Sequence, residues 1–221
     1  MRTSTLVLGL CLCCSPSVLA QTGKCAVAAS DSVQAKREHD LKMAEIIQAL
    51  GLKDGSKVAD IGAGDGNYEV AMSRVVGATG RIYAEDISPG SIKRLHERVD
   101  EGHLANVEVI EGLADDPKLP AGALDAVLMV ITYHEIADHQ KMLEHVVAAL
   151  KPAGRLVVVD MTPHKTLNRP RADQVKNHVI APDLAESEIR QAGLEVVTRD
   201  DHFMDNPDEE STRWMIVSRK L

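Results

Sequence analysis

The chain has 221 residues, a net charge of −8 and a sequence pI of about 5.6. This acidic balance argues against a nucleic-acid partner, because contacts with phosphates need clustered Lys and Arg side chains. Apolar residues make up 44% of the chain, enough for a full core, and aromatic residues only 2%, so that core must be aliphatic. The length suits one domain of ordinary size with a short tail.

The first twenty residues differ in composition from the rest of the chain. Arg2 gives a basic start, residues 5–14 form an apolar run too short to span a bilayer, and Ala20 resembles a signal-peptidase site. We therefore expect residues 1–20 to be a secretory signal, with an uncleaved anchor as the alternative, and residues 21–32 to be a linker. The mature protein would be periplasmic or secreted, without a stable membrane span. Without cleavage it would be cytoplasmic.

Three of the four cysteines lie inside this first segment, at Cys11, Cys13 and Cys14. After cleavage only Cys25 would remain, so no internal disulfide is expected. Lipid attachment at one of the three is a weaker alternative, because none of them follows a good run of small residues.

Helix and strand patterns alternate from residue 33 onward. Apolar residues at a spacing of three to four predict a helix over 33–50, which Gly51 ends. Short aliphatic runs predict strands at 57–61, 81–85, 107–110, 124–131, 155–160, 194–198 and 213–218. The helices predicted between them are 67–76, 89–99, 138–150 and 182–192.

This alternation predicts an α/β, Rossmann-like, doubly wound domain over residues 33–221, with a mostly parallel seven-stranded sheet. The segment between the last two strands is too short and polar for a helical crossover. We therefore expect these two strands to pair antiparallel, so that the last strand runs against the others. Residues 205–210 are acidic and contain Pro207, which predicts a solvated loop.

The stretch "VADIGAGDGNY", residues 58–68, places Gly62, Gly64 and Gly66 directly after the first predicted strand. Ligands bind beyond the carboxyl ends of the strands in such sheets, and glycine lets a ligand touch the main chain. The spacing G-x-G-x-G differs from the dinucleotide fingerprint G-x-G-x-x-G. A carboxylate at Asp60 is a poor neighbour for a pyrophosphate, but it suits a ligand that carries an ammonium group.

A second carboxylate lies at the end of the next predicted strand. Asp86 comes twenty residues after Gly66, where its two oxygens can accept hydrogen bonds from both hydroxyls of a ribose. The alternation of side chains along a strand predicts that neighbouring Glu85 points the other way.

Together these residues resemble the class I S-adenosylmethionine-dependent methyltransferases. The resemblance covers roughly residues 35–221 and is strongest in "KVADIGAGDGNY", "GRIYAEDISPGSI", "LPAGALDAVLMV" and "LKPAGRLVVVD". It implies an enzyme that binds S-adenosyl-L-methionine and transfers its methyl group to a small-molecule acceptor. By position, Asp60, Gly62 and Gly64 would line the methionine end of the cofactor, with Gly66 at the helix start.

The same resemblance implies contacts with the nucleoside. Asp86 would hold the ribose and Ile87 would pack on the adenine. Asp115, which follows the third predicted strand, would bind the adenine amino group, with Asp116 as its rival.

A base is needed in methyl transfer only if the acceptor is protonated. "ITYHEIADH" follows the fourth predicted strand and offers Tyr133, His134 and Glu135 near the expected methyl group. We expect His134 to act as the base and Tyr133 to shape the pocket or contact the sulfonium; a packing or capping role is the alternative for His134. His134 and His139 are five residues apart, which breaks the H-E-x-x-H pattern of a zinc helix, so we expect no metal.

Residues 161–180 form the longest predicted irregular segment, and such loops often close over a substrate. Four of its residues are candidates for contact with an anionic or polar acceptor: His164, Arg169, Arg171 and His178. A solvated loop is the alternative.

Other functions are compatible with this pattern. A non-catalytic S-adenosylmethionine-binding sensor or scaffold is the main alternative, and the glycine spacing disfavours a nicotinamide-linked oxidoreductase. The sequence leaves the acceptor open among a small metabolite, a lipid-like quinone precursor and a protein side chain. It does not predict the oligomeric state. Export is in tension with a cofactor that is made in the cytosol.

Overall fold

The structure, a computed structural model, describes residues 34–39, 41–163, 168–206 and 211–221 in two compact units that divide after Leu41. In the first unit, residues 34–39 are helical. The predicted signal and linker and all four cysteines lie outside the described residues.

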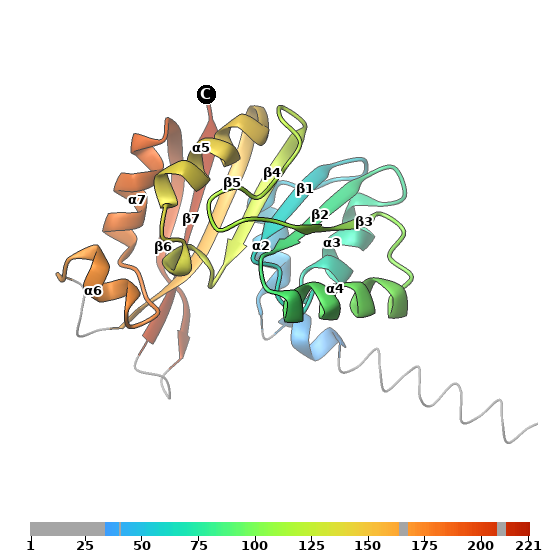
Figure 1. The fold of residues 1–221 in the computed structure, drawn as a ribbon, viewed down its shortest axis with the longest axis horizontal. Helices are drawn as coiled ribbons and strands as arrows, with labels where there is room; N and C mark the ends of the chain where they lie inside the picture. The colour runs from blue at the N-terminus through green and yellow to red at the C-terminus, as the bar shows by residue number, and fades with distance from the viewer. Residues whose placement is uncertain (1–33, 40, 164–167, 207–210) are drawn as a thin grey trace, which may run out of the picture. The chain divides into compact units, whose positions relative to one another are not determined.

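The second unit contains one seven-stranded sheet with the order β3-β2-β1-β4-β5-β7-β6 (Figure 1). Strands β1 to β5 run parallel to one another, and β7 is antiparallel to both β5 and β6. The predicted fold class, including the antiparallel last strand, is confirmed. The strands are β1 (Lys57–Ile61), β2 (Arg81–Asp86), β3 (Val107–Glu111), β4 (Leu124–Val130), β5 (Leu150–Pro163), β6 (Leu194–Asn206) and β7 (Ser211–Lys220).

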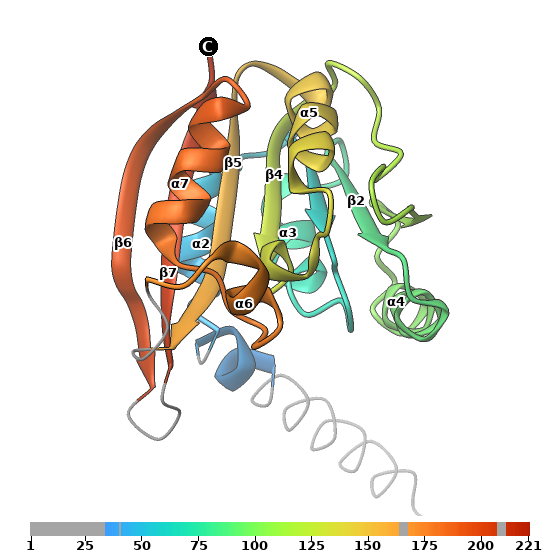
Figure 2. The same cartoon turned by 60° about the vertical axis from the view of Figure 1, so that its left-hand side comes forward.

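Helices cover both faces of this sheet. The helices are α2 (Met43–Leu50), α3 (Glu69–Val76), α4 (Pro89–Glu101), the 3₁₀ helix η1 (Tyr133–Glu135), α5 (His139–Ala149), α6 (Arg171–Val175) and α7 (Pro182–Gln191). In Figure 2, α5 and α7 lie in front of the sheet, and α2 and α3 lie behind it. None of the helices among the described residues is long and apolar enough to cross a bilayer.

The helix predicted over 33–50 is wrong as one continuous element. Leu41 and Lys42 form a turn, and Lys42 has a φ of +48°, so α2 begins anew at Met43. The apolar spacing continues across the break, which is why the sequence pattern alone did not reveal it.

The core is aliphatic, as predicted, and lies where α5 and α7 pack against the sheet. Leu143 of α5, Ile189 of α7 and Val158 of β5 are fully buried in it. Trp214 of β7 is the largest buried side chain, and its indole N–H donates to the carbonyl of Ile180 at 2.8 Å. A buried indole needs such a partner, and here the bond also fixes the segment that leads into α7.

The hairpin of β6 and β7 is longer than the sequence pattern indicated. β6 runs to Asn206, with Asp205 paired to Thr212, so the loop predicted over 205–210 is wrong at its first two residues. Residues 207–210 lie outside the described part of the chain. A register shift between Asp200 and Met204 interrupts the ladder, and this irregularity hides the period of two that marks a strand.

Candidate functional site

A cavity of about 270 Å³ lies at the carboxyl ends of β1, β2 and β4. This is the place where the strand order reverses and where open α/β sheets bind their ligands. Its wall is largely apolar and carries a few carboxylates. The lining residues are Ile61, Gly62, Glu85, Asp86, Ile87, Leu113, Ala114, Val130, Ile131, Thr132, Glu135, Ile136, Ala137 and Met142.

The glycine loop after β1 adopts a backbone conformation that residues with a side chain rarely adopt. The φ angles of Gly62, Gly64 and Gly66 are +74°, +60° and +68°. A Cβ atom on Gly62 would lie 2.3 Å from Oγ1 of Thr132, so the loop packs tightly there. At Gly64 the nearest atom is 3.9 Å away. The main chain at Gly64 is therefore bare, which leaves room for a ligand.

The carboxylate of Asp86 joins β2 to this loop. One oxygen accepts the backbone N–H of Gly64 at 3.0 Å, and the other accepts the backbone N–H of Ser88 at 2.8 Å. Each carboxylate oxygen has a further lone pair, so the group can accept two more donors, such as the hydroxyls of a ribose. Asp86 lines the cavity, as its predicted role requires.

Two buried carboxyl groups lie behind the loop. Among the described residues, one oxygen of Asp60 and both oxygens of Glu69 have no hydrogen-bond partner. Burial raises the pKa of Asp60 well above its ordinary value, and the nearby charge of Glu69 adds to this effect. Burial also raises the pKa of Glu69 to about 7. Asp60 itself is not among the residues that line the cavity, whereas its neighbours Ile61 and Gly62 are.

Glu85 is a third buried carboxyl group. Its side chain lies over Gly112, where a Cβ atom would come within 1.8 Å of a Glu85 oxygen. Burial raises the pKa of Glu85 to about 8, against the lowering effect of the backbone N–H of Gly62. The glycine at position 112 is therefore what allows a glutamate to be buried at the end of β2.

Two exposed apolar side chains lie at the cavity. Ile87 is 54% exposed and Leu113 is 50% exposed, and both line it. Exposed apolar side chains that flank a cavity provide surfaces on which a flat base can pack. The placement of Ile87 fits its predicted contact with adenine.

Asp115 and Asp116 are not brought to the cavity. A short bridge between Leu113 and Asp116 turns the chain, so that Ala114 lines the cavity and Asp115 does not. The Asp115 carboxylate instead lies 2.5 Å from Nζ of Lys141, which lowers its pKa. The prediction that Asp115 binds the adenine does not fit this geometry, because its carboxylate already has a partner on α5.

The chain turns sharply after β4. Ile131 has a φ of +54°, although a β-branched residue rarely adopts the left-handed region. The turn brings Thr132 against Gly62 and leads directly into η1. Such strain is typical of functional sites, where the surrounding structure holds it in place.

Tyr133 points into the core rather than into the cavity. Its hydroxyl donates to Glu188 at 2.7 Å, and burial raises its pKa. The same carboxylate lies 2.9 Å from Nε of Arg171 and 3.2 Å from Nε2 of His139. This cluster ties η1 to α5, α6 and α7. Tyr133 is thus placed to hold η1 in position.

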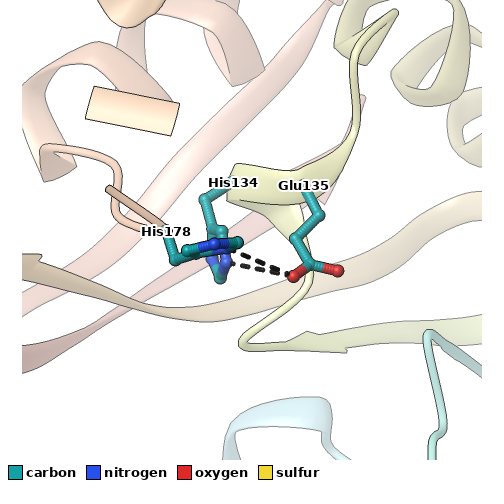
Figure 3. A group of neighbouring side chains, drawn as sticks. All are labelled: His134, Glu135 and His178. Carbon is teal, nitrogen blue, oxygen red and sulfur yellow. Dashed lines mark ion pairs between the residues drawn. The ribbon is translucent and has the colours of Figure 1, made fainter. Parts of the chain in front are cut away.

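His134 is buried and held by Asp160, the last residue of the predicted strand "RLVVVD". The two Asp160 oxygens bind the backbone N–H of His134 at 2.9 Å and its Nδ1 at 2.7 Å. Burial alone would lower the pKa of His134, but its hydrogen bond to Asp160 raises it. Its Nε2 faces Glu135 at 3.7 Å, and Glu135 lines the cavity (Figure 3).

The described candidate residues of segment 161–180 lie in different surroundings. Arg171 begins the unpredicted helix α6 and contacts Glu188, whereas Nδ1 of His178 lies 3.6 Å from Glu135. Arg169 is exposed, and His164 lies outside the described residues. The contacts of Asp160 and Glu188 were not predicted, although a carboxylate at the end of an apolar strand was a usable signal for Asp160.

A Rossmann-like sheet with this glycine loop and this carboxylate at the end of β2 defines a class I S-adenosylmethionine-dependent methyltransferase. Residues 28–185 match the model of the ubiE/COQ5 methyltransferase family, and the chain belongs to that family.

Among curated relatives, the ubiquinone/menaquinone biosynthesis C-methyltransferase UbiE of Cronobacter sakazakii is 27% identical over 173 residues, 77% of this chain and 68% of the relative. The protein of that name from an Enterobacter species is 30% identical over 117 residues, 52% of this chain and 47% of the relative. The matches thus span from about half to two thirds of these relatives.

Solved structures show the same fold. A methyltransferase from Aquifex aeolicus, described as dependent on S-adenosylmethionine, superposes with a TM-score of 0.68 at 24% identity, covering 81% of this chain and 89% of that one. The geranyl diphosphate C-methyltransferase of Streptomyces coelicolor, solved with S-adenosyl-L-homocysteine, gives 0.69 at 14% identity, covering 84% and 80%.

The family assignment confirms the predicted enzyme class and the predicted cofactor. The chain is an S-adenosylmethionine-dependent methyltransferase.

Proposed function

We propose that S-adenosylmethionine binds in the cavity at the carboxyl ends of β1, β2 and β4. The observation that carries this proposal is the hydrogen bond from the N–H of Gly64 to Asp86. This bond holds the carboxylate that would bind the ribose against the exposed main chain of the glycine loop. The adenine packs between Ile87 and Leu113. The methionine end lies along the main chain of Gly62 and Gly64.

Of the other residues predicted to bind the cofactor, two have an indirect role and one has no role in the proposed site. Asp60 lies behind the loop with one unpaired oxygen, where the positive ammonium group of the cofactor would favour the ionised form of its carboxyl group. Gly66 allows the turn into α3, because a Cβ atom there would lie 3.0 Å from Arg98. The proposal omits Asp115, whose carboxylate is bound to Lys141 outside the cavity.

We infer that the acceptor is a small, electron-rich ring compound that is methylated on carbon. The description of the family and the names of the curated relatives support this class. So does the apolar wall of the cavity, which is formed by Val130, Ile136, Ala137 and Met142. The cofactor supplies an electrophilic methyl group, so that a C–CH₃ bond replaces a C–H bond while S-adenosylhomocysteine and a proton are released. The protein's part is to orient the ring and exclude water.

The acceptor side of the cavity is formed by the turn after β4. Glu135 lines the cavity. His134 contributes to the acceptor side through Nε2, the ring nitrogen that does not bind Asp160. Tyr133 serves as a positioning residue, because its hydroxyl is used by Glu188.

The test is a transfer assay with S-adenosylmethionine labelled in the methyl group. Prenylated hydroquinones and simple phenols form the main panel, with primary amines and protein substrates as comparisons. We expect label in a ring C–CH₃ group, identified by mass spectrometry after fragmentation. Labelling of nitrogen or of protein alone would contradict the acceptor class. Tight cofactor binding without turnover on any compound would favour the sensor reading.

We also propose that residues 1–20 act as an export signal. The basic start, the short apolar run and Ala20 support it, and they are features of the sequence alone. N-terminal sequencing of the protein from separated cell fractions tests it. A chain that starts at Gln21 in the exported fraction is expected, whereas an intact Met1 only in the cytosol would reject export.

A further inference from the structure

The neighbouring residues His134 and Glu135 and the distant residue His178 converge beside the cavity, whose wall includes Glu135. The ligand-forming atoms of His134, Glu135 and His178 all lie within 4.8 Å of one another. One oxygen of Glu135 is 3.7 Å from Nε2 of His134 and 3.6 Å from Nδ1 of His178 (Figure 3). The carboxylate thus stands between two imidazoles.

The fixed member of this cluster is His134. Asp160, itself fully buried, holds Nδ1 at 2.7 Å and so directs Nε2 toward the cluster. Within the described residues, Nε2 makes no hydrogen bond. A carboxylate that binds the far nitrogen of a histidine is the usual outer partner of a metal-binding imidazole, because it fixes both the ring and its tautomer.

The second imidazole is positioned by the backbone around α6. His178 has a φ of +55°, and its N–H donates to the carbonyl of Val175 at 3.0 Å. Buried Gln174 accepts the N–H of Ala181 at 2.6 Å, which anchors the chain just beyond it. The side chain of His178 is 74% exposed, so its ring can rotate and direct a nitrogen toward the cluster.

We propose that His134, Glu135 and His178 bind a divalent transition-metal ion. Donors that lie about 2.0–2.2 Å from a tetrahedral ion are about 3.3–3.6 Å apart, close to the two separations measured here. Two imidazoles and one carboxylate suit Zn²⁺, Co²⁺ or Fe²⁺ and leave coordination positions open. With Asp160 behind His134, the site has both its inner ligands and an outer partner.

The location of the ion gives it a function, which rests on the function proposed above. Glu135 belongs both to the cluster and to the cavity wall, so the open coordination positions face the place proposed for the acceptor. A hydroxyl oxygen of the acceptor binds there as its anion, and its proton passes to solvent. The acceptors are thus ring compounds with an ionisable hydroxyl, held by that oxygen.

The expectation of no metal rests on the spacing of His134 and His139, and these two histidines are not the pair proposed here. His134 and His139 cannot share an ion, because His139 contacts Glu188 on the core side. The partner is His178, which is 44 residues away in the chain and reaches the site only through the fold of α6.

Titration of the metal-free full chain with Co²⁺ tests the site, because the visible absorption of Co²⁺ reports its ligands. We expect one equivalent to bind, and Zn²⁺ to displace it. His178→Ala and Glu135→Gln are each expected to weaken binding roughly tenfold or more, as is the outer-partner variant Asp160→Asn. His202→Ala is the matched control, since His202 forms an exposed pair with Asp205 away from the cavity.

Calorimetry with S-adenosylhomocysteine is run on the wild type and on His178→Ala. We expect unchanged affinity for this ligand in His178→Ala, because His178 does not line the cavity. That result shows that this variant folds and that only the ion site is lost, whereas Glu135→Gln is compared in the Co²⁺ titration alone. If these two variants bind Co²⁺ as the wild type does, or if no stoichiometric binding occurs, the ion site is overturned while the cofactor site stands. Absence of S-adenosylhomocysteine binding in the wild type would instead overturn the proposed function.

Discussion

The Asp86 carboxylate accepts the backbone N–H of Gly64 at 3.0 Å, and this bond links the end of β2 to the loop after β1. The two residues are 22 positions apart in the chain, and Asp86 lines the cavity. The carboxylate is therefore held in place before a ligand arrives, and the loop is held with it. Such preorganisation reduces the entropy that binding must overcome.

Asp86→Ala should weaken S-adenosylhomocysteine binding by roughly ten- to a hundredfold. The change removes a charged acceptor for ribose hydroxyls, and each such bond contributes about 1.5–3 kcal/mol. Calorimetric titration measures the effect. Asp115→Ala is the matched control and should bind as the wild type does, because Asp115 pairs with Lys141 outside the cavity. Equal loss in the two variants would restore the adenine role predicted for Asp115.

The two glycines at the centre of the loop should differ in their tolerance of a methyl group. Gly62→Ala places a Cβ atom 2.3 Å from Thr132, so it should lower the free energy of unfolding by more than the cost of about 1–2 kcal/mol for a left-handed backbone. Gly64→Ala meets only that backbone cost, because the space beside it is open. Urea denaturation of both variants measures the difference. Equal destabilisation would contradict the packing described for Gly62.

Stability should fall as the pH rises through neutrality. Glu69 and Glu85 have folded pKa values of about 7 and about 8, above their ordinary value of 4.5. The folded state therefore binds these protons more tightly than the unfolded chain does. Their contribution to stability is fully present below pH 4.5 and is lost toward pH 8, falling by about 1.4 kcal/mol per pH unit for each group between pH 4.5 and its folded pKa.

Urea denaturation between pH 4.5 and 8.5 measures this dependence. Glu85→Gln should flatten it and raise stability at pH 8 relative to the wild type, since an amide cannot ionise. Exposed Glu111 offers the control, and Glu111→Gln should keep the wild-type slope. A Glu85→Gln variant that is as pH-dependent as the wild type would show that Glu85 does not titrate in this range.

Tyr133→Phe should cost about 1 kcal/mol of stability and leave kcat within a few-fold of the wild type. The hydroxyl donates to Glu188 in the core, and Glu188 keeps Arg171 and His139 as partners in the variant. Thermal unfolding and the labelled-methyl assay measure the two quantities. A collapse of kcat without a loss of stability would return Tyr133 to a direct role in catalysis.

Local patterns were sufficient to predict the fold class and its seven strands, but not the break before α2 or the helix α6. Strands β1 and β4 are short apolar runs buried on both faces, and such runs are typical of the centre of a parallel sheet. The glycine loop and Asp86 were predictable too, because each lies at a fixed offset from a strand end. The roles assigned to them depended on the resemblance to a known family.

Contacts between distant residues were not predictable in this way. The bond of His134 to Asp160 and the approach of His178 to Glu135 depend on how β4, β5 and α6 pack, and no local spacing encodes that. Asp115 shows the reverse case, since its position matched the family but a turn directs its carboxylate to Lys141.

A crystal structure of the full chain with S-adenosylhomocysteine tests directly whether this cavity binds the methyl donor. We expect both ribose hydroxyls within hydrogen-bond distance of Asp86, the adenine between Ile87 and Leu113, and the amino-acid end along Gly62 and Gly64. Ligand density elsewhere, or a ribose that does not contact Asp86, would contradict the assignment of this cavity to the methyl donor.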